Sequence, residues 1–470
     1  MGLGFCVRAV PLLRFWYRAK PQKGHGVHAN KLVRRVAGLG KAVVMIGWCL
    51  VDGDGERDGS IPDEFMAADG GWPGWAFHRV VPGRAHLVIA VRCRPNRRLR
   101  CGRCGSIAAG YDQGGGIRVW RHVEIGWATC ALVGAATRVS CPERGVTVAA
   151  VPWARHDSPL TRAFDDVLVN MAVKSSKKAT ADRYGVSWRA VNNACCRVAD
   201  EALARVDLFE GLRAIAIDEV KYKKGQRYLT IVSNHATGRV IWAKKGRNKK
   251  VVESFFAGLG AERAALLEIV TCDGAAWIHD VVKVRAPNAD ICLDTFHVVS
   301  WATKALDEVR RDEWNRLRRE GNADAARAVK GTRWLLLRNW ANLKPGHKGA
   351  LRDVHAANQR LGRAWELKEE LVALFDTGWV HVGHAFNEWL AWASRSKLAP
   401  FVKLARTIRA FRTSIMATIE YGYTNGLAES NNASIGRIRA NARGFHDPEA
   451  FIKMIMLDRA GLTPPLPWAA

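Results

Sequence analysis

Long hydrophobic runs are missing from this sequence of 470 residues. A membrane-spanning helix needs roughly 18 or more consecutive apolar residues, and the longest candidate, residues 42–51, is too short. The first residues of the chain are apolar but carry Arg8, Arg14 and Arg18, which is not the pattern of a secretory signal. We therefore expect a protein without a membrane partner.

Acidic residues are few relative to basic ones. The chain has 72 Lys and Arg but 44 Asp and Glu, which gives a formal net charge of +28. A solvated basic surface would also explain such a balance, but an excess of this size favours a polyanionic partner, above all nucleic acid.

The cysteines are too irregular to build a disulfide framework. They number 11, an odd count, and follow no regular spacing. This usage is typical of a reducing compartment, and we expect a cytoplasmic protein.

Acidic residues end two short apolar runs in the middle of the chain. Residues 214–220 (Ala-Ile-Ala-Ile-Asp-Glu-Val) predict a buried central strand with Asp218 near its carboxyl end. A second apolar run, residues 265–272, ends directly before Asp273, and a third acid, Glu429, lies near the start of a later helix. A lone Asp in such a place usually ends a strand or caps a turn, but three acids in this order suggest a common site.

The order of elements around these acids predicts an α/β fold with a mixed sheet of the ribonuclease H kind. Two strand-like runs separate the first two acids, and a helix, a strand and a long helix follow Asp273. In such a sheet the first strand and the later parallel strand can lie side by side, so Asp218 and Asp273 would project from neighbouring strand ends. Facing carboxylates repel unless they share Mg²⁺ or Mn²⁺, which prefer oxygen ligands. Paired metals of this kind indicate phosphoryl transfer.

Four segments carry a resemblance to a known family. They are Ile217-Asp218-Glu219-Val220-Lys221-Tyr222-Lys223-Lys224-Gly225-Gln226-Arg227-Tyr228-Leu229-Thr230, Cys272-Asp273-Gly274, Asp294-Thr295-Phe296-His297, and Asn425-Gly426 followed by Glu429 and Asn432. In this order they resemble the DDE transposases of bacterial insertion sequences, and more narrowly the ISL-three family, over roughly residues 85–465.

The resemblance implies a ribonuclease H-like catalytic domain at 212–297 and 422–460, interrupted by a helical insertion at 298–421. It also implies that three acids form a catalytic triad that holds two Mg²⁺ or Mn²⁺ ions: Asp218, Asp273 and Glu429.

The resemblance further implies a transposase that binds the terminal inverted repeats of an insertion sequence, cuts DNA strands and joins the freed 3′-hydroxyl to target DNA. Self-association on DNA is expected because two ends must be held together, and the expected location is the nucleoid of the bacterial cytoplasm. Two alternatives stay open, namely a decayed copy that only binds DNA and a metal-dependent nuclease without strand transfer. Ser430 and Ser434 stand where many relatives carry Gly and Lys, which motivates the first alternative.

The N-terminal part predicts an extension followed by a zinc-ribbon-like module. Residues 1–80 are first basic and then acidic, and the working start could be Met45 or Met66. The module, at 85–150, supplies three candidate zinc ligands: Cys101 and Cys104, spaced as a zinc knuckle, and Cys141. Arg144 occupies the place where the family typically has the fourth cysteine. Cys93, His122 or Cys130 could replace it, although a buried thiol is as often a small core residue.

Residues 155–208 predict a helix-turn-helix DNA-binding domain. Gly185 suits the left-handed end of one helix and Ser187 suits the N-cap of the next, which begins at Trp188. Four polar side chains are predicted to face outward as DNA contacts: Arg189, Asn192, Asn193 and Arg197. The alternative is a helical bundle whose exposed face is merely polar.

Further basic residues surround the predicted catalytic domain. Lys244, Lys245 and Arg247 follow the third strand and form either a solvated turn or a phosphate track beside the acids. Arg437, after Glu429, could neutralise a DNA strand. His297 either assists proton transfer or is a hydrogen-bonded residue at an ordinary helix start. The eight tryptophans of the insertion predict core packing for most and base stacking for one or two.

Overall fold

The computed structural model describes residues 75–82, 86–93, 98–114, 116–125, 128–376 and 379–467. The chain divides into two compact units, residues 1–164 and 165–470, and each is considered by itself. The predicted N-terminal extension through residue 74, with both alternative starts, lies outside the described residues. In the ranges given above, no helix combines the length and apolar character that crossing a bilayer requires.

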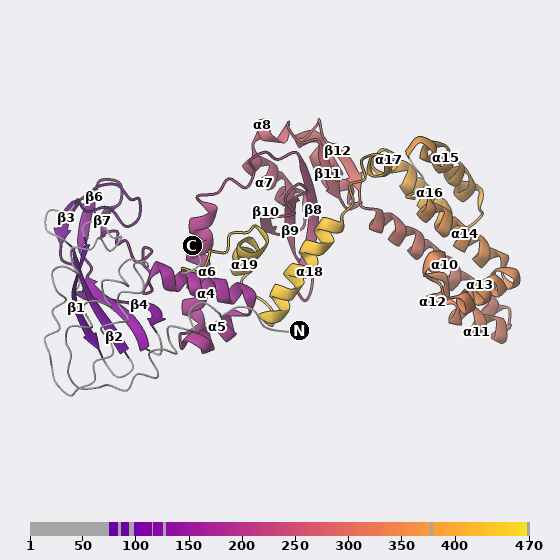
Figure 1. Cartoon of the computed structure of the whole chain (residues 1–470). Coiled ribbons are helices and arrows are strands. Elements are labelled where there is room, and N and C mark those ends of the chain that lie inside the picture. Colours follow the sequence, from indigo (N-terminus) through magenta and orange to yellow (C-terminus); the bar gives the residue numbers. More distant parts are fainter. Residues whose placement is uncertain are drawn as a thin grey trace, which may run out of the picture. The chain divides into compact units, whose positions relative to one another are not determined.

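Two small sheets form the first unit (Figure 1). The four-stranded sheet has the order β1-β2-β5-β4, and its strands are β1 (Trp75–Pro82), β2 (His86–Cys93), β4 (Ile117–Ile125) and β5 (Ala128–Ala135). The three-stranded sheet consists of β3 (Ala109–Asp112), β6 (Arg138–Cys141) and β7 (Gly145–Val148). Alternate residues of β2 and β5, such as Ile89 and Leu132, are buried with Trp120 and Trp153 and form the core of the larger sheet.

Three helices follow the two sheets: α4 (Arg162–Lys174), whose first residues belong to the first unit, and then α5 (Lys177–Tyr184) and α6 (Trp188–Leu203). The predicted caps are confirmed, because Gly185 has φ +58° at the end of α5 and the Ser187 side chain accepts a hydrogen bond from the amide of Ala190. The left-handed conformation favours glycine, which lacks a Cβ. Four residues of α6 form the predicted inner face and are buried: Val191, Ala194, Cys195 and Val198.

A five-stranded mixed sheet follows, with the order β10-β9-β8-β11-β12. Its strands are β8 (Ala214–Lys223), β9 (Arg227–Asn234), β10 (Val240–Lys245), β11 (Ile269–Cys272) and β12 (Asp290–Leu293). The first three strands pair antiparallel, whereas β8, β11 and β12 are parallel to one another. The predicted strand at 265–272 is shorter than expected, because the chain leaves the short helix α8 (Ala261–Ala264) through a turn before β11 begins.

Helices cover both faces of this sheet (Figure 1). Side chains of one face, including Ile215 and Ile217 of β8, pack against α7 (Lys249–Leu259) and α9 (Ala276–Arg285). The other face packs against α18 (Gly426–Asn441) and α19 (Pro448–Arg459). Successive residues of a strand alternate between the two faces. Asp218 therefore leaves β8 on the side of α18, and Glu219 leaves it on the side of α7.

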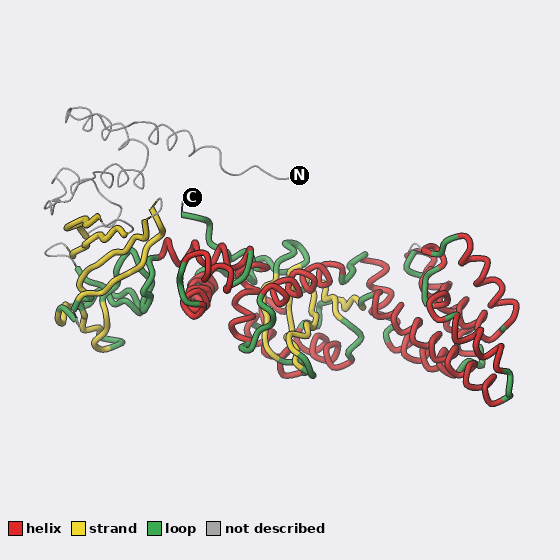
Figure 2. Tube along the Cα trace, turned by 90° about the horizontal axis from the view of Figure 1, so that it is seen from below, coloured by secondary structure: helices red, strands yellow, loops and turns green. Residues whose placement is uncertain are grey.

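The described residues between β12 and α18, the predicted helical insertion, form helices that are joined by loops, as Figure 2 shows. The elements are α10 (Thr295–Arg319), α11 (Ala323–Gly331), α12 (Arg333–Leu336), η2 (Trp340–Asn342), α13 (Pro345–Ala357), α14 (Gln359–Ala373), α15 (Trp379–Arg395), α16 (Ala399–Ala410) and α17 (Arg412–Tyr421).

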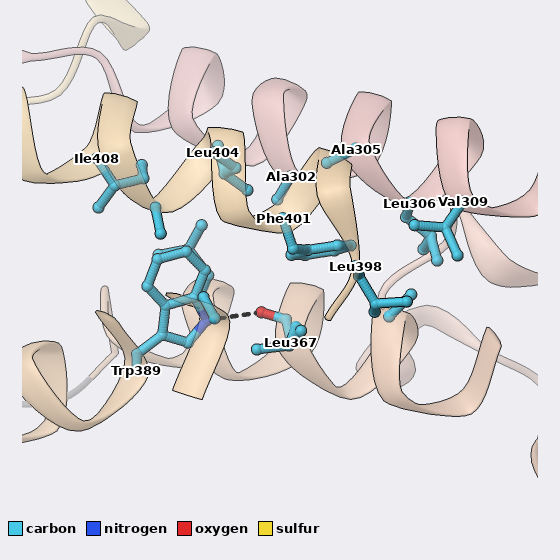
Figure 3. Close-up of a cluster of buried hydrophobic side chains, with 14 of the residues drawn as sticks. Ala302, Ala305, Leu306, Val309, Leu367, Trp389, Leu398, Phe401, Leu404 and Ile408 are labelled. Carbon is cyan, nitrogen blue, oxygen red and sulfur yellow. Dashed lines mark hydrogen bonds between the residues drawn. The ribbon is translucent and has the colours of Figure 1, made fainter. Parts of the chain in front are cut away.

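The insertion has its own apolar core (Figure 3). Trp389 is 3% exposed, and its indole Nε1 donates a hydrogen bond of 2.8 Å to the carbonyl of Leu367. Trp301, Trp314, Trp340, Trp365 and Trp392 are partly buried against the same core. Core packing is thus confirmed for these tryptophans, whereas Trp334 is 69% exposed.

Candidate active site across the parallel strands

Three carboxylates follow one another across the parallel strands. Thr271 pairs with Ala216, and Cys272 pairs with Leu293. Continuing this register places Asp273 beside both Asp218 and Asp294; Asp273 and Asp294 directly follow β11 and β12, whereas Asp218 lies in the middle of β8. The predicted placement of Asp218 and Asp273 on neighbouring parallel strands is confirmed, but Asp218 does not end its strand, because β8 continues to Lys223. Asp294 was not predicted as a member of this acid row (Asp218, Asp273 and Asp294), although it directly follows the last strand.

Asp218 is held by two hydrogen bonds. Its Oδ1 accepts from the amide of Glu219 and its Oδ2 accepts from Nδ2 of Asn432, both at 2.7 Å. Burial raises the pKa of the Asp218 carboxyl; these hydrogen bonds oppose the rise, and the charges of Asp273 and Asp294 add to it. Burial and the neighbouring carboxylates thus destabilise the ionised form of Asp218, and a divalent cation bound by oxygen ligands would stabilise it.

Asp273 is fixed by the turn that follows β11. Its Oδ1 accepts a hydrogen bond of 3.0 Å from the amide of Ala275, and its backbone carbonyl accepts one of 3.1 Å from Nε2 of His279. These contacts hold the carboxylate just beyond the strand end, where its second oxygen is available for a ligand.

Asp294 and His297 form a pair at the start of α10. The Asp294 side chain is 5% exposed; it caps the helix at the amide of Phe296 and accepts a hydrogen bond of 2.8 Å from Nδ1 of His297. That hydrogen bond raises the pKa of His297, burial opposes the rise, and the charges of Asp294, Asp273 and Asp218 contribute to it. His297 is thus both the hydrogen-bonded residue of a capped helix and a cation-prone group beside the acid row.

Glu429 lies in the first turn of α18 and is exposed. Asn432, three residues later, contacts Asp218, and residues three apart share one face of a helix. Glu429 therefore lies on the side of α18 that faces Asp218 on β8. Among the described residues, the ligand atoms that lie within 4.8 Å of one another in a group of three belong to three cysteines of the first unit. The carboxylate of Glu429 is therefore not part of such a group.

A network of buried polar groups seats α18 on the sheet. Nδ2 of Asn431 donates to Oγ of Ser233 at 3.0 Å, and the guanidinium of Arg459 on α19 donates to Oδ1 of Asn431. Asn431 is 1% exposed, so these bonds fix the rotation of α18. The sequence motif contained Asn432, but the sequence alone did not reveal which strand this residue or its neighbour Asn431 would contact.

Glu219 was quoted with the motif but was not predicted as a site residue. Its side chain is 7% exposed and forms an ion pair with Arg247, while its Oε1 is buried without a hydrogen-bond partner. Burial raises the pKa of Glu219 to about 7; Arg247 opposes this rise, and the charges of Asp273 and Asp218 add to it.

The predicted basic residues near the acids differ in their engagement. Nζ of Lys244 donates to Oγ of Ser254 at 3.0 Å, Lys245 is exposed, and Arg437 donates to Oγ of Ser434 at 2.9 Å. Arg247 differs from these three residues because its guanidinium forms an ion pair with Glu219.

The four predicted contacts on α6 fall into two pairs. Arg189 and Asn193 are exposed and lie one turn apart. Asn192 accepts a hydrogen bond of 2.7 Å from Nζ of Lys177, and Arg197 pairs at 2.8 Å with Asp165, whose side chain is fully buried. The first pair is thus available to a ligand, whereas the second also connects the helices of the domain.

Three thiols gather in the first unit as the sequence predicted. The sulfurs of Cys101, Cys104 and Cys141 lie within 4.8 Å of one another, and those of Cys104 and Cys141 are 3.5 Å apart. Hydrogen bonds from Ser106 lower the pKa of Cys104 to about 7, whereas burial raises that of Cys141. Thiols so grouped suit a thiophilic metal such as zinc.

No fourth ligand joins this three-cysteine group within the part of the chain that the structure describes. Arg144 is exposed at the turn after β6. Nδ1 of His122 instead forms a hydrogen bond of 2.8 Å with Thr161, and Cys130 belongs to the core of the larger sheet. The side chain of Cys93 lies outside the described residues.

Comparison with known proteins gives matches over the three-helix region and over the region that contains the acid row. A family model described as "Transposase", for the DDE domain of the ISL3 family, matches residues 215–455, and one described as "Helix-turn-helix domain of transposase family ISL3" matches residues 149–199. The chain is 41% identical over 402 residues to the transposase for insertion sequence element IS1557 of two Mycobacterium tuberculosis strains, CDC 1551 / Oshkosh and ATCC 25618 / H37Rv, which covers 82% of this chain and 90% of the relative. It is 27% identical over 406 residues to the transposase for insertion sequence element IS1001 of Bordetella parapertussis, which covers 83% of this chain and 97% of the relative.

Proposed function

Because the chain belongs to transposase family ISL3 of the insertion sequences, we propose that it binds the terminal inverted repeats of its element and catalyses metal-dependent DNA strand cleavage and strand transfer. The observation that carries the proposal is the placement of Asp218 and Asp273 side by side on adjacent parallel strands, with α18 fixed to Asp218 through Asn432. The neighbouring carboxylates of Asp218 and Asp273, with Glu429 on the side of α18 that faces Asp218, suit Mg²⁺ or Mn²⁺.

We assign a ribonuclease H-like fold to residues 212–297 and 422–460, with 298–421 as a helical insertion. The strand order supports this assignment, because β8, β9 and β10 are antiparallel, and β11 and β12 extend the sheet beside β8 as parallel strands. The other proposed domains are the helix-turn-helix at 155–208 and the zinc-ribbon-like module at 85–150.

Each acid has a separate task in the proposed reaction. Asp218 and Asp273 would hold the ions, and Glu429 would complete the site and help to deprotonate the attacking hydroxyl group. The bound ions would supply Lewis acidity at the attacking and leaving oxygens of the in-line displacement. The hydrogen bond to Asp294 raises the pKa of His297, which favours a protonated imidazole beside the acid row. From there the imidazolium could donate a hydrogen bond to a phosphate oxygen.

DNA recognition is assigned to the basic and polar groups outside the acid row. Arg189 and Asn193 would read base edges, with Asn192 and Arg197 supporting the helix. Lys244, Lys245, Arg247 and Arg437 would contact phosphates.

Zinc is proposed for the group formed by Cys101, Cys104 and Cys141, with a fourth ligand that is not Arg144. Self-association on the two element ends and a place in the bacterial nucleoid complete the proposal.

The test uses the purified full chain with genomic DNA that flanks its reading frame. In Mg²⁺ we expect cleavage at the ends of flanking inverted repeats and, with labelled 3′-hydroxyl ends, joined products. Asp218→Asn should bind the same DNA but cut none of it. Cleavage without joining would favour a nuclease, binding without any cleavage would favour a decayed copy, and cleavage that persists in a chelator would refute every metal-dependent version.

A further inference from the structure

Glu219 leaves β8 on the opposite side from Asp218, and this separates the roles of the two neighbouring acids. Its cross-strand partner on β9 is Thr230, and that of Thr230 on β10 is Lys244. These residues share the face that carries α7, whereas Asp218 faces α18 and Asn432. Glu219 is therefore poorly placed to share an ion with Asp218 and Glu429. It is well placed to contact Arg247, which lies just before α7.

The segment that carries Arg247 is fixed on both sides. The amide of Gly246 donates to the carbonyl of Tyr228, and Oγ1 of the fully buried Thr230 donates to the carbonyl of Gly246, both at 2.9 Å. Gly246 has φ +124°, a conformation that other residues rarely adopt. On the other side, Asn248 caps α7 through the amide of Val251. The backbone of Arg247 thus has little freedom.

The guanidinium of Arg247 is held as firmly as its backbone. It pairs with Glu219 and lies over the ring of Tyr228, 5.1 Å from the ring centroid. Both partners are on the α7 face, because Tyr228 and Thr230 alternate with the buried Leu229 on β9. The Arg247 side chain is still 44% exposed, so the cation is oriented but open to a ligand. Three exposed cations adjoin it in the chain: Lys245, Lys249 and Lys250.

From this geometry we infer that Glu219 is a positioning residue, which holds the Arg247 guanidinium against Tyr228 so that it contacts a DNA phosphate next to the acid row. The inference rests on the proposed function, since it takes the DNA strand to be the substrate of that row. A planar guanidinium fixed by a carboxylate and an aromatic ring loses little freedom on binding phosphate. The surrounding lysines supply charge without a fixed direction.

The sign of the effect of Glu219→Gln on DNA binding distinguishes this role from a purely electrostatic one. The substitution removes a negative charge, and if that charge alone mattered, the variant would bind the polyanion more tightly. If Glu219 orients Arg247, the variant binds element-end DNA more weakly and, in Mg²⁺, cuts it roughly 10-fold more slowly or worse. Arg247→Gln should show the same defects and lower the slope of log affinity against log salt by about 0.9.

The experiment compares the full chain with both single variants and with the Glu219→Gln/Arg247→Gln double variant. We expect the double variant to be no worse than Arg247→Gln, because Glu219 acts through Arg247. Lys283→Gln is the control, which removes one exposed cation of α9 to which no DNA contact is assigned, and it should leave the rate of cutting by bound protein unchanged. Circular dichroism melts check that each variant is folded.

Three outcomes would overturn the inference. These are tighter DNA binding by Glu219→Gln, additive effects of the two substitutions, and a raised Mg²⁺ requirement in Glu219→Gln alone, which would make Glu219 a metal ligand. DNA affinity and its salt slope are measured without cleavage. If the unmutated chain binds element ends but cuts nothing, the proposed activity fails while the Glu219–Arg247 comparison still gives its answer.

Discussion

Replacing Glu219 with Gln should stabilise the folded chain at neutral and alkaline pH. The side chain is 7% exposed, and burial is the main reason why the pKa of its carboxyl rises from 4.5 to about 7. Between these values the folded state keeps a proton that the unfolded state has lost. Stability therefore falls as pH rises from about 4.5 through about 7, and the full cost applies above that range.

The size of this cost follows from the same two values. One pKa unit corresponds to 1.36 kcal/mol, so a rise from 4.5 to about 7 amounts to about 3 kcal/mol. Gln has nearly the same shape but no charge, so it should remove this cost at pH 8 and change little at pH 5. At about 2 to 4 °C per kcal/mol, the melting temperature of the variant at pH 8 should exceed that of the parent by several degrees.

The assay is thermal or urea unfolding of both proteins from pH 5 to pH 8.5 in the presence of EDTA. Divalent cations are removed because an ion bound to the neighbouring acids would itself stabilise the folded state. Glu262→Gln, at an exposed position of α8, is the control and should show no difference that grows with pH. A constant difference between Glu219→Gln and the parent across this range would refute the reasoning.

Three other substitutions test separate parts of the structure. Asn432→Ala should slow cleavage without weakening DNA binding, because Asp218 loses the hydrogen bond that links it to α18; equal rates at saturating Mg²⁺ would contradict this role. Arg197→Ala should destabilise the protein by about 1.5 to 3 kcal/mol in urea unfolding, since it removes the charged hydrogen bond to the buried Asp165, whereas Arg189→Ala should leave stability unchanged and weaken specific DNA binding by about 1 to 3 kcal/mol. Cys141→Ser should release zinc from the full chain as measured by metal analysis, and an unmutated chain purified without zinc would exclude the metal altogether.

Local sequence patterns were sufficient to predict the strands that carry the first two acids. Residues 214–217 form a continuous apolar run that is buried on both faces of the strand, residues 269–272 are buried in the same way, and Asp218 and Asp273 directly follow these runs. The end of β8 was predicted too early, because Val220 and Tyr222 continue the strand on its other face, where they pack with residues of α18 and α19. In sequence, a strand end with apolar residues at every second position is hard to distinguish from a turn unless it is known that helices cover that face of the sheet.

Contacts between distant segments could not be predicted from the sequence. The bond between Asn432 and Asp218 joins residues 214 positions apart, and the pairing of Glu219 with Arg247 depends on the twist and register of three strands. The outward face predicted for α6 was right for Arg189 and Asn193. For Arg197, helical periodicity alone could not show that a buried acid on α4 would pair with it.

The helical insertion begins and ends at the same strand, and this explains how Glu429 can belong to a site formed by residues so far away in the sequence. The chain leaves β12 at Asp294 and returns with α17, where Oγ1 of Thr418 donates a hydrogen bond of 2.8 Å to the carbonyl of Leu293. The hydroxyl of Tyr421 then donates to Oδ2 of Asp290 at 2.7 Å, at the other end of β12. Since both ends of the insertion are tied to one short strand, its length does not affect where α18 starts. The interior of the insertion can therefore vary while the acids keep their positions, provided that α17 keeps its contact with β12.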